Sequence, residues 1–142
     1  MAELDHADRP ARVVRTTRQG QAVLGIVDQS KNFHSAQDIH AQLRAAGEAV
    51  GLTTVYRHLA LLAEVGQLDS VQTPDGELLY RRCHSSQHHH HIVCRECGYG
   101  TEVELEDLEQ WVEATANSFG YSDLTHMVEI FGLCAHCRQA SL

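Results

Sequence analysis

Apolar residues recur every three to four positions in three stretches of the first half of the chain, which predicts three amphipathic helices. The first helix would begin at a capping pattern formed by Thr16 and Gln19 and would run to about Asp28. The second would begin at another capping pattern, Ser35-Ala-Gln-Asp38, and would end at Gly47. The third lies between two glycines further along the chain. The apolar residues expected to face the core from the first and third helices are Val23, Ile26, Val27, Val55, Leu59 and Leu62.

Two short segments after these helices have the alternation and composition of β-strands. They are Leu68–Val71 and Leu78–Arg82, and Pro74-Asp75-Gly76 between them is a typical turn sequence. Three helices followed by a strand pair indicate a winged helix-turn-helix domain over residues 11–83, preceded by a flexible arm over residues 1–10. Helix-turn-helix shapes also occur in proteins that do not bind DNA, so this pattern alone leaves the function open.

The pattern changes after Cys83, and we expect a hinge at residues 84–87 and a second domain over residues 88–142. Strands are predicted at 89–93, 101–105 and 125–133, with a helix at 107–119. The helix residues expected to face inward are Leu108, Trp111, Val112 and Thr115. The predicted fold class is therefore α+β: an N-terminal winged helix-turn-helix domain plus a small α/β domain with a three-stranded antiparallel sheet.

Composition narrows the class of protein without identifying it. The net charge of −8 argues against a general polyanion binder, although a sequence-specific DNA-binding protein needs only a local basic face. The apolar runs are far shorter than the roughly 20 residues of a membrane span, and the first residues lack a secretory signal pattern. We therefore expect a cytoplasmic protein that has no membrane partner and whose cysteine thiols stay reduced.

Two Cys-x-x-Cys pairs carry the most specific chemical signal. Cys94 and Cys97 form the first pair, and Cys134 and Cys137 form the second. Together they can surround one Zn²⁺ tetrahedrally, and four thiolates leave no open position, so the site would be structural. Disulfide bonds are the alternative, but an odd total of five cysteines in a reducing compartment fits metal ligation better.

Four consecutive histidines, from His88 to His91, precede the first cysteine pair. In an extended chain neighbouring side chains point to opposite faces, so His88 and His90 would serve one metal site and His89 and His91 another. The unassigned donors that can complete these sites are Asp69, Cys83, Glu109 and His126. A site built from Asp69, Cys83 and one histidine pair would bridge the two halves, and metal there would fix their relative angle. Taken singly, each of these donors is equally consistent with an ordinary surface or strand residue.

These features together resemble the ferric uptake regulator (Fur) family, and most closely its zinc uptake regulator (Zur) branch. The matching motifs, in family order, are Arg15-Thr-Thr-Arg18-Gln19, Ser35-Ala-Gln-Asp38, Gly51-Leu-Thr-Thr-Val55-Tyr56-Arg57, His88–His91 with Cys94-x-x-Cys97, and Cys134-x-x-Cys137. The resemblance implies a metal-loaded homodimeric repressor that binds double-stranded operator DNA, whose second domain is the dimerisation domain.

The resemblance also assigns roles by position. It implies up to three Zn²⁺ per subunit: the structural cysteine site, a regulatory hinge site and a dimerisation-domain site. The hinge ligands would be Asp69, Cys83, His89 and His91, and the dimerisation-domain ligands would be Glu109, His88, His90 and His126. The residues implied to contact DNA are Arg15, Arg18, Thr53, Thr54, Tyr56 and Arg57.

Two departures from the iron-sensing members bear on the metal. His90 stands where those members commonly have Asp, and Phe33 stands where they use a histidine, although the neighbouring His34 can shift the register. A hinge site with Cys83 is softer than a nitrogen-and-oxygen site, which favours zinc over iron. We expect a zinc-responsive repressor of zinc-uptake and zinc-homeostasis genes; the alternative is a family member that senses nickel or iron.

Two other function classes compete with a repressor. A zinc hydrolase or deaminase needs an open metal position and a general acid or base, and the deaminase signature His-x-Glu followed by Pro-Cys-x-x-Cys is not in the sequence. We therefore expect no catalytic residues and no small-molecule substrate. A zinc-buffering module that does not bind DNA is the third hypothesis.

Overall fold

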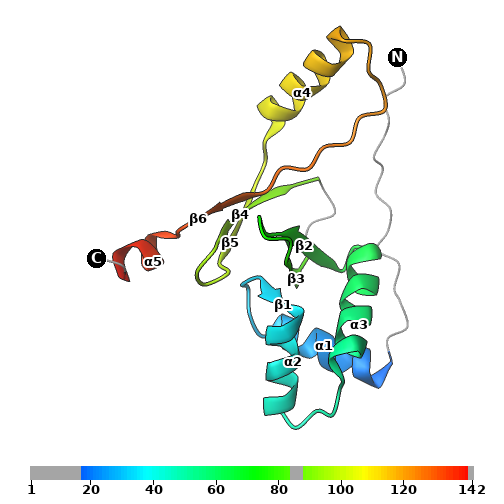
Figure 1. The fold of residues 1–142 in the computed structure, drawn as a ribbon, viewed down its shortest axis with the longest axis vertical. Helices are drawn as coiled ribbons and strands as arrows, with labels where there is room; N and C mark the ends of the chain where they lie inside the picture. Colours follow the sequence, from blue (N-terminus) through cyan, green and yellow to red (C-terminus); the bar gives the residue numbers. More distant parts are fainter. Residues whose placement is uncertain (1–16, 84–87, 141–142) are drawn as a thin grey trace.

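The computed structural model describes residues 17–83 and 88–140 (Figure 1). Three helices and a small sheet form the first half, and a second sheet with two helices forms the other half. The arm at residues 1–10, Arg15 and the hinge at residues 84–87 lie outside the described residues, as do their predicted roles. Within the described ranges, none of the helices combines the length and the apolar character that crossing a membrane requires.

The helices of the first half are α1 (Arg18–Asp28), α2 (Ala36–Ala45) and α3 (Leu52–Glu64). The cap of α1 is Thr17, whose hydroxyl accepts a 3.1 Å bond from the Gly20 N–H, so the helix begins one residue later than the pattern predicted. The Ser35 hydroxyl caps α2 as expected. All six predicted inward residues are buried in one core, which confirms the helical pattern; they are Val23, Ile26, Val27, Val55, Leu59 and Leu62.

The wing consists of β2 (Leu68–Gln72) and β3 (Leu78–Arg82), which pair antiparallel. Gly76 closes their turn at a φ of +91°, a conformation that glycine adopts without strain. A two-residue strand, β1 (His34–Ser35), pairs with β3 and completes the sheet in the order β1-β3-β2. So short a strand leaves no alternation in the sequence, and it was not predicted. The helices and the sheet together confirm the winged helix-turn-helix fold.

The second half is built on a sheet of β4 (His90–Cys94), β5 (Gly100–Val103) and β6 (Ile130–Gly132), in the order β5-β4-β6. The three strands were predicted, but β6 runs parallel to β4, so this sheet is mixed rather than antiparallel throughout. The reason is the connection: β5 leads away to α4, and the chain returns on the other side of β4 in the direction of β4 (Figure 1). The last strand is also shorter than predicted, and a helix that was not predicted, α5 (Ala135–Ala140), follows it.

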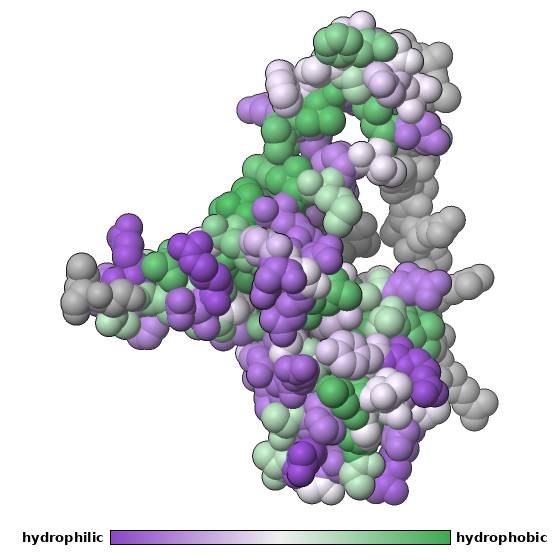
Figure 2. Space-filling model, in the orientation of Figure 1, coloured by the Kyte–Doolittle hydropathy of each residue, from purple (hydrophilic) through white to green (hydrophobic). Residues whose placement is uncertain are grey.

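Helix α4 (Glu106–Ser118) stands away from both sheets, and none of its residues is buried. The prediction that Trp111 faces inward was wrong, since it is 64% exposed, and the other predicted inner residues, Leu108, Val112 and Thr115, are only half-buried. Helical spacing predicts an apolar face but does not say what covers it. Figure 2 shows hydrophobic residues gathered from α4 down towards the second sheet. Other large apolar side chains exposed in this half are Ile92, Tyr99, Phe119, Tyr121, Leu124, Met127, Ile130 and Leu133.

Two substitutions on α3 test the core of the first half. Leu59 is fully buried, so Leu59→Ala removes packed methyl groups and should destabilise the protein by about 2–5 kcal/mol. Leu61 on the same helix is 41% exposed, and Leu61→Ala should change stability by no more than about 0.5 kcal/mol. Urea unfolding followed by circular dichroism measures both, and equal losses would contradict the described packing.

Candidate metal centres

The four cysteines of the two Cys-x-x-Cys pairs converge on one point. Cys94 ends β4, Cys97 lies in the following turn, Cys134 follows β6 and Cys137 lies on α5. They meet because β6 pairs with β4, with Cys94 opposite Gly132. Their sulfur atoms all lie within 4.8 Å of one another, and the Sγ atoms of Cys97 and Cys134 are 3.8 Å apart. Sulfurs bound to one tetrahedral Zn²⁺ at about 2.3 Å would be separated by about 3.8 Å, so the cluster fits zinc.

The acidities of these thiols also suit a cation. Burial would raise the pKa of Cys94, but backbone N–H groups, including that of Cys134 at 3.3 Å, donate to its Sγ and lower the pKa to about 6. The hydrogen bond with Cys134 raises the pKa of Cys137 to about 12. One thiolate therefore forms readily while a second is opposed by its neighbours. A divalent cation removes that opposition, and metal binding here would release protons.

A second cluster joins His88, His90, Glu109 and His126, whose ligand atoms also lie within 4.8 Å of one another. The Glu109 carboxylate, on α4, lies 2.6 Å from the Nε2 of His88 and 2.8 Å from that of His90. The hydrogen bond with His90 lowers the pKa of Glu109, so this carboxylate is charged at neutral pH. The backbone oxygen of Val128 lies 3.3 Å from the Nδ1 of His90 and orients the ring.

A third cluster crosses between the two halves of the chain. Asp69 on wing strand β2 lies 3.0 Å from the Nε2 of His89 and 3.2 Å from the Nε2 of His91. Burial would raise the pKa of Asp69, but its contacts with the imidazoles of His91 and His89 outweigh burial and lower the pKa. The ligand atoms of these three residues lie within 4.8 Å of one another.

Two buried histidine nitrogens support metal binding in the second and third clusters. Within the described residues, Nε2 of His91 and Nε2 of His126 have no hydrogen bond of good geometry. Each points towards its cluster carboxylate, His91 at 3.2 Å from Asp69 and His126 at 3.6 Å from Glu109. A buried nitrogen without a hydrogen bond is costly, and a metal ion would complete its coordination.

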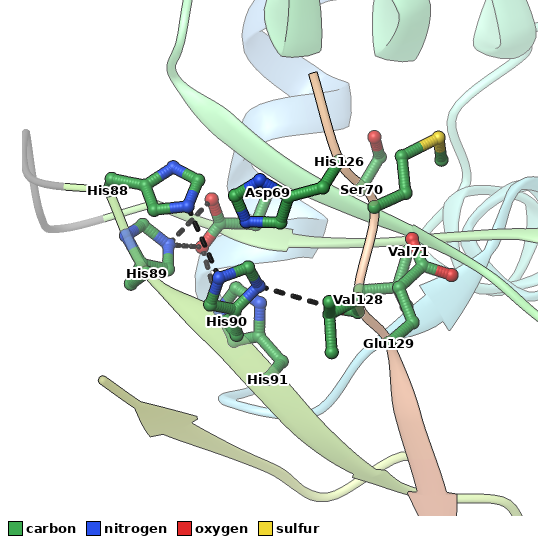
Figure 3. Close-up of a pocket in the computed structure, with 11 residues that line it drawn as sticks. Asp69, Ser70, Val71, His88, His89, His90, His91, His126, Val128 and Glu129 are labelled. Carbon is green, nitrogen blue, oxygen red and sulfur yellow. Dashed lines mark hydrogen bonds and ion pairs between the residues drawn. The ribbon is translucent and has the colours of Figure 1, made fainter. Parts of the chain in front are cut away.

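The histidine run divides its rings between these two clusters in alternation. His88 and His90 turn to one side and His89 and His91 to the other, as the extended chain predicted (Figure 3). A cavity of about 280 Å³ lies between the clusters and is lined by all four histidines together with Asp69 and His126. The segment that leads into β4 thus places two groups of donors side by side.

Cys83 and Glu102 occupy unexpected positions around the third cluster. Cys83 does not join the group formed by Asp69, His89 and His91, but it lines a neighbouring cavity of about 710 Å³ together with Asp69. Glu102 on β5 lines the same cavity, and its carboxylate lies 3.5 Å from the Nδ1 of His89. Sequence reasoning missed Glu102, because its placement depends on the pairing of His91 with Glu102 across β4 and β5.

The candidate DNA contacts lie on two helices of the winged-helix half. Thr53, Tyr56 and Arg57 are exposed on α3, and Thr54 is half-buried beside them. Arg18 is exposed at the start of α1. An exposed face on the third helix is available to a groove of DNA, in the manner of a helix-turn-helix protein.

A winged-helix half joined to a sheet with clustered Cys, His and carboxylate donors defines a metal-binding winged-helix protein. The sequence model of the ferric uptake regulator family matches residues 11–131. The chain is 47% identical over 125 residues to a zinc uptake regulation protein of Mycobacterium tuberculosis (strain CDC 1551 / Oshkosh), covering 88% of this chain and 95% of that protein. The chain therefore belongs to the ferric uptake regulator family.

Solved structures agree with this membership. A zinc uptake regulator complexed with zinc and DNA matches with a TM-score of 0.72 at 29% identity, over 92% of this chain and 87% of that one. The crystal structure of FurB from M. tuberculosis, a zinc uptake regulator, matches with a TM-score of 0.50 at 47% identity, over 90% of this chain and 98% of that one.

Metal analysis of two serine variants separates the cysteine roles. Cys94→Ser removes one of four converging sulfurs, and we expect it to lose one metal ion per chain and to unfold or monomerise the second half. Cys83→Ser should remain a folded dimer that keeps the metal of the four-cysteine cluster but responds poorly to added metal. Elemental analysis with size-exclusion chromatography measures both variants, and a fully metal-loaded Cys94→Ser dimer would contradict the four-cysteine site.

Proposed function

We propose that this protein is a zinc-responsive transcriptional repressor that binds operator DNA as a metal-loaded homodimer and represses genes of zinc uptake and zinc homeostasis. The observation that carries the proposal is the third cluster, because Asp69 belongs to the winged-helix half and His89 and His91 to the other half. The relatives named as zinc uptake regulators support zinc as the metal.

Regulation would act through the angle between the two halves. Asp69, His89 and His91 would hold the hinge ion, and Cys83 on the neighbouring cavity wall would supply a fourth ligand. Zinc bound there supplies a positive charge that ties carboxylate, imidazole and thiolate donors together. Since the donors come from both halves, occupancy would favour one orientation of α3 relative to the rest of the dimer.

Up to three zinc ions per subunit are proposed, one for each donor group found in the described residues. The four-cysteine cluster would hold a structural ion. The cluster of Glu109, His88, His90 and His126 would link the first turn of α4 to the start of β4, since Glu109 lies on α4 and His90 on β4. The Asp69 cluster would hold the regulatory ion, and the softness of Cys83 favours zinc there over iron. The second cluster, rich in imidazole, also suits nickel, so nickel belongs in any test of the sensed metal.

DNA recognition would use α3 as the helix in the major groove. The exposed Arg57 guanidinium can pair bidentately with a guanine, and the ring of the exposed Tyr56 can pack on a thymine methyl. Arg15 and Arg18 would contact phosphates, and Thr53 and Thr54 lie beside the reading residues. The acidic net charge then keeps non-specific binding weak, because only this local face is suited to DNA.

The homodimer would form through the second half. Trp111, Phe119 and Met127 are 64%, 76% and 80% exposed in the single chain, and β6 is an edge strand whose backbone groups can pair with another strand. A second copy would cover these apolar residues. A dimeric repressor of this kind would act in the cytoplasm, where operator DNA and reduced cysteines coexist.

Operator binding in zinc-buffered solutions tests the sensing role. We expect tight binding at high free zinc and weak binding after chelation, and we expect His91→Ala to bind weakly at both levels because it removes a bridging donor. His136→Ala changes an exposed histidine outside the donor groups and should behave as wild type. Fluorescence anisotropy with the operator measures all three, with nickel and iron as parallel arms. Equal wild-type affinity with and without metal would refute the proposal.

A substitution on α3 tests the recognition role. Arg57→Ala should cost about 1–3 kcal/mol of discrimination between the operator and an unrelated sequence, because a bidentate base contact is lost. Arg44→Ala, an exposed arginine on α2, is the matched control and should leave discrimination unchanged. Competition binding with the two DNAs measures the ratio. A zinc-buffering protein without a DNA function would be indifferent to both changes.

A further inference from the structure

A contact outside the metal clusters joins the two halves of the chain at Phe33. This residue precedes β1 and is 3% exposed. Its backbone N–H donates a 2.7 Å hydrogen bond to the backbone oxygen of Gly98, in the turn that carries Cys97. Beside it, the Asn32 amide donates to the backbone oxygen of Cys97 at 3.2 Å. The winged-helix half therefore binds directly to the loop of the first cysteine pair.

Arg81 of wing strand β3 strengthens the same contact. Its guanidinium lies 4.7 Å from the centre of the Phe33 ring, and its Nη1 donates a 2.8 Å hydrogen bond to the backbone oxygen of Gly100. A cation over a ring and a hydrogen bond from that cation hold β3, Phe33 and β5 together. Phe33 also belongs to an apolar cluster that includes Val71 and Leu79 of the wing and Val93 and Phe131 of the second sheet.

Two glycines of the second half leave the space that this contact needs. A Cβ on Gly98 would lie 2.3 Å from the backbone oxygen of Phe33, and the φ of Gly98 is +77°. A Cβ on Gly100 would lie 2.6 Å from the Phe33 ring and 2.8 Å from the Arg81 Nη1. The surfaces of the two halves are therefore complementary in shape at this contact.

The Phe33 ring also contacts the third cluster, which holds the proposed hinge metal. It lies edge-on to the His91 imidazole, with ring centres 5.1 Å apart and an interplanar angle of 77°. His91 is buried, so the orientation of its ring depends on these neighbours. We propose that Phe33 and Arg81 are positioning residues that hold the His91 ring for the hinge metal and connect the four-cysteine loop to that site.

This inference rests on the hinge site of the proposed function and extends it. Apart from the His91 ring itself, the side chains and backbone oxygens in the Phe33 contact are not ligand atoms of the three clusters, so the contact does not compete with them for metal. It preorganises one donor before binding, which raises metal affinity without adding a ligand. It also implies that loss of the four-cysteine ion, which would loosen the Cys97–Gly100 turn, weakens metal binding at the hinge.

Hinge-metal affinity in the full chain, with the four-cysteine cluster loaded, tests the role of Phe33 and Arg81. We use Zn²⁺ as the probe in competition with a chromophoric chelator, in a His90→Ala background that disables the second cluster. Phe33→Leu keeps an apolar side chain but loses both ring contacts, and Arg81→Met keeps an aliphatic side chain but loses the cation. Each should weaken hinge binding about tenfold. Ile39→Val, in the separate core of the first half, should leave affinity unchanged.

A second measurement separates positioning from general stability. With His90 intact, Phe33→Leu and Arg81→Met should leave the affinity of the cluster that contains Glu109 within twofold of wild type. Weakening of both clusters alike, or an equal loss in Ile39→Val, would show a general structural effect and overturn the inference. Unchanged hinge affinity in both variants would overturn it as well, provided that His91→Ala still abolishes that affinity. In the His90→Ala background with the four-cysteine cluster loaded, zinc binding that does not need His91 would instead refute the hinge site, and with it the proposed function.

Discussion

The contact between the Asp69 carboxylate and the imidazoles of His89 and His91 is the interaction on which the arrangement of the two halves depends. Asp69 lies on the wing, whereas His89 and His91 lie at the start of β4. The distances between these side chains therefore depend on how the two halves are oriented. Burial opposes a charged carboxylate, but the contacts with the two imidazoles outweigh burial and lower the pKa of Asp69. A further bond crosses nearby, from the backbone N–H of Gln72 to the Glu129 carboxylate at 2.8 Å. These charged and polar contacts stabilise the docked arrangement of the two halves.

The two-residue period of an extended strand explains how one short segment serves two clusters. Successive histidines turn to opposite sides, so the run needs no insertion or loop to reach both Asp69 and Glu109. The same backbone links the two groups mechanically. Metal bound by His88 and His90 would also fix the chain on either side of His89 and adjacent to His91. The two proposed sites would therefore be coupled through the backbone that they share.

Sequence predicted the elements whose signals are local. The cap at Ser35, the buried face of α3 and the convergence of the cysteine pairs all follow from residue type and spacing. The features that the sequence did not predict depend on how the strands pair or on which surface covers an apolar face. The parallel alignment of β6 follows from where α4 returns the chain, and the placement of Glu102 follows from strand register. Trp111 was assigned inward because its spacing is amphipathic, yet spacing is the same whether the covering surface belongs to this chain or to another.

The position of Cys83 distinguishes the third cluster, which contains Asp69, His89 and His91, from the other two clusters. Four sulfurs converge in the cysteine cluster, and four donors converge in the Glu109 cluster. The third cluster has only three donors, and Cys83 lies outside it. Cys83 follows β3, and its backbone N–H donates a hydrogen bond to the backbone oxygen of Gln67. The wing therefore fixes the main chain of Cys83. Recruiting its sulfur as a fourth ligand would require the side chain to turn or the wing to approach β4. The Phe33 contact limits movement of the wing, because it already ties β3 to β5 through Arg81. An incomplete donor set beside a preformed interdomain contact is therefore the part of this molecule in which metal occupancy and domain orientation can depend on each other.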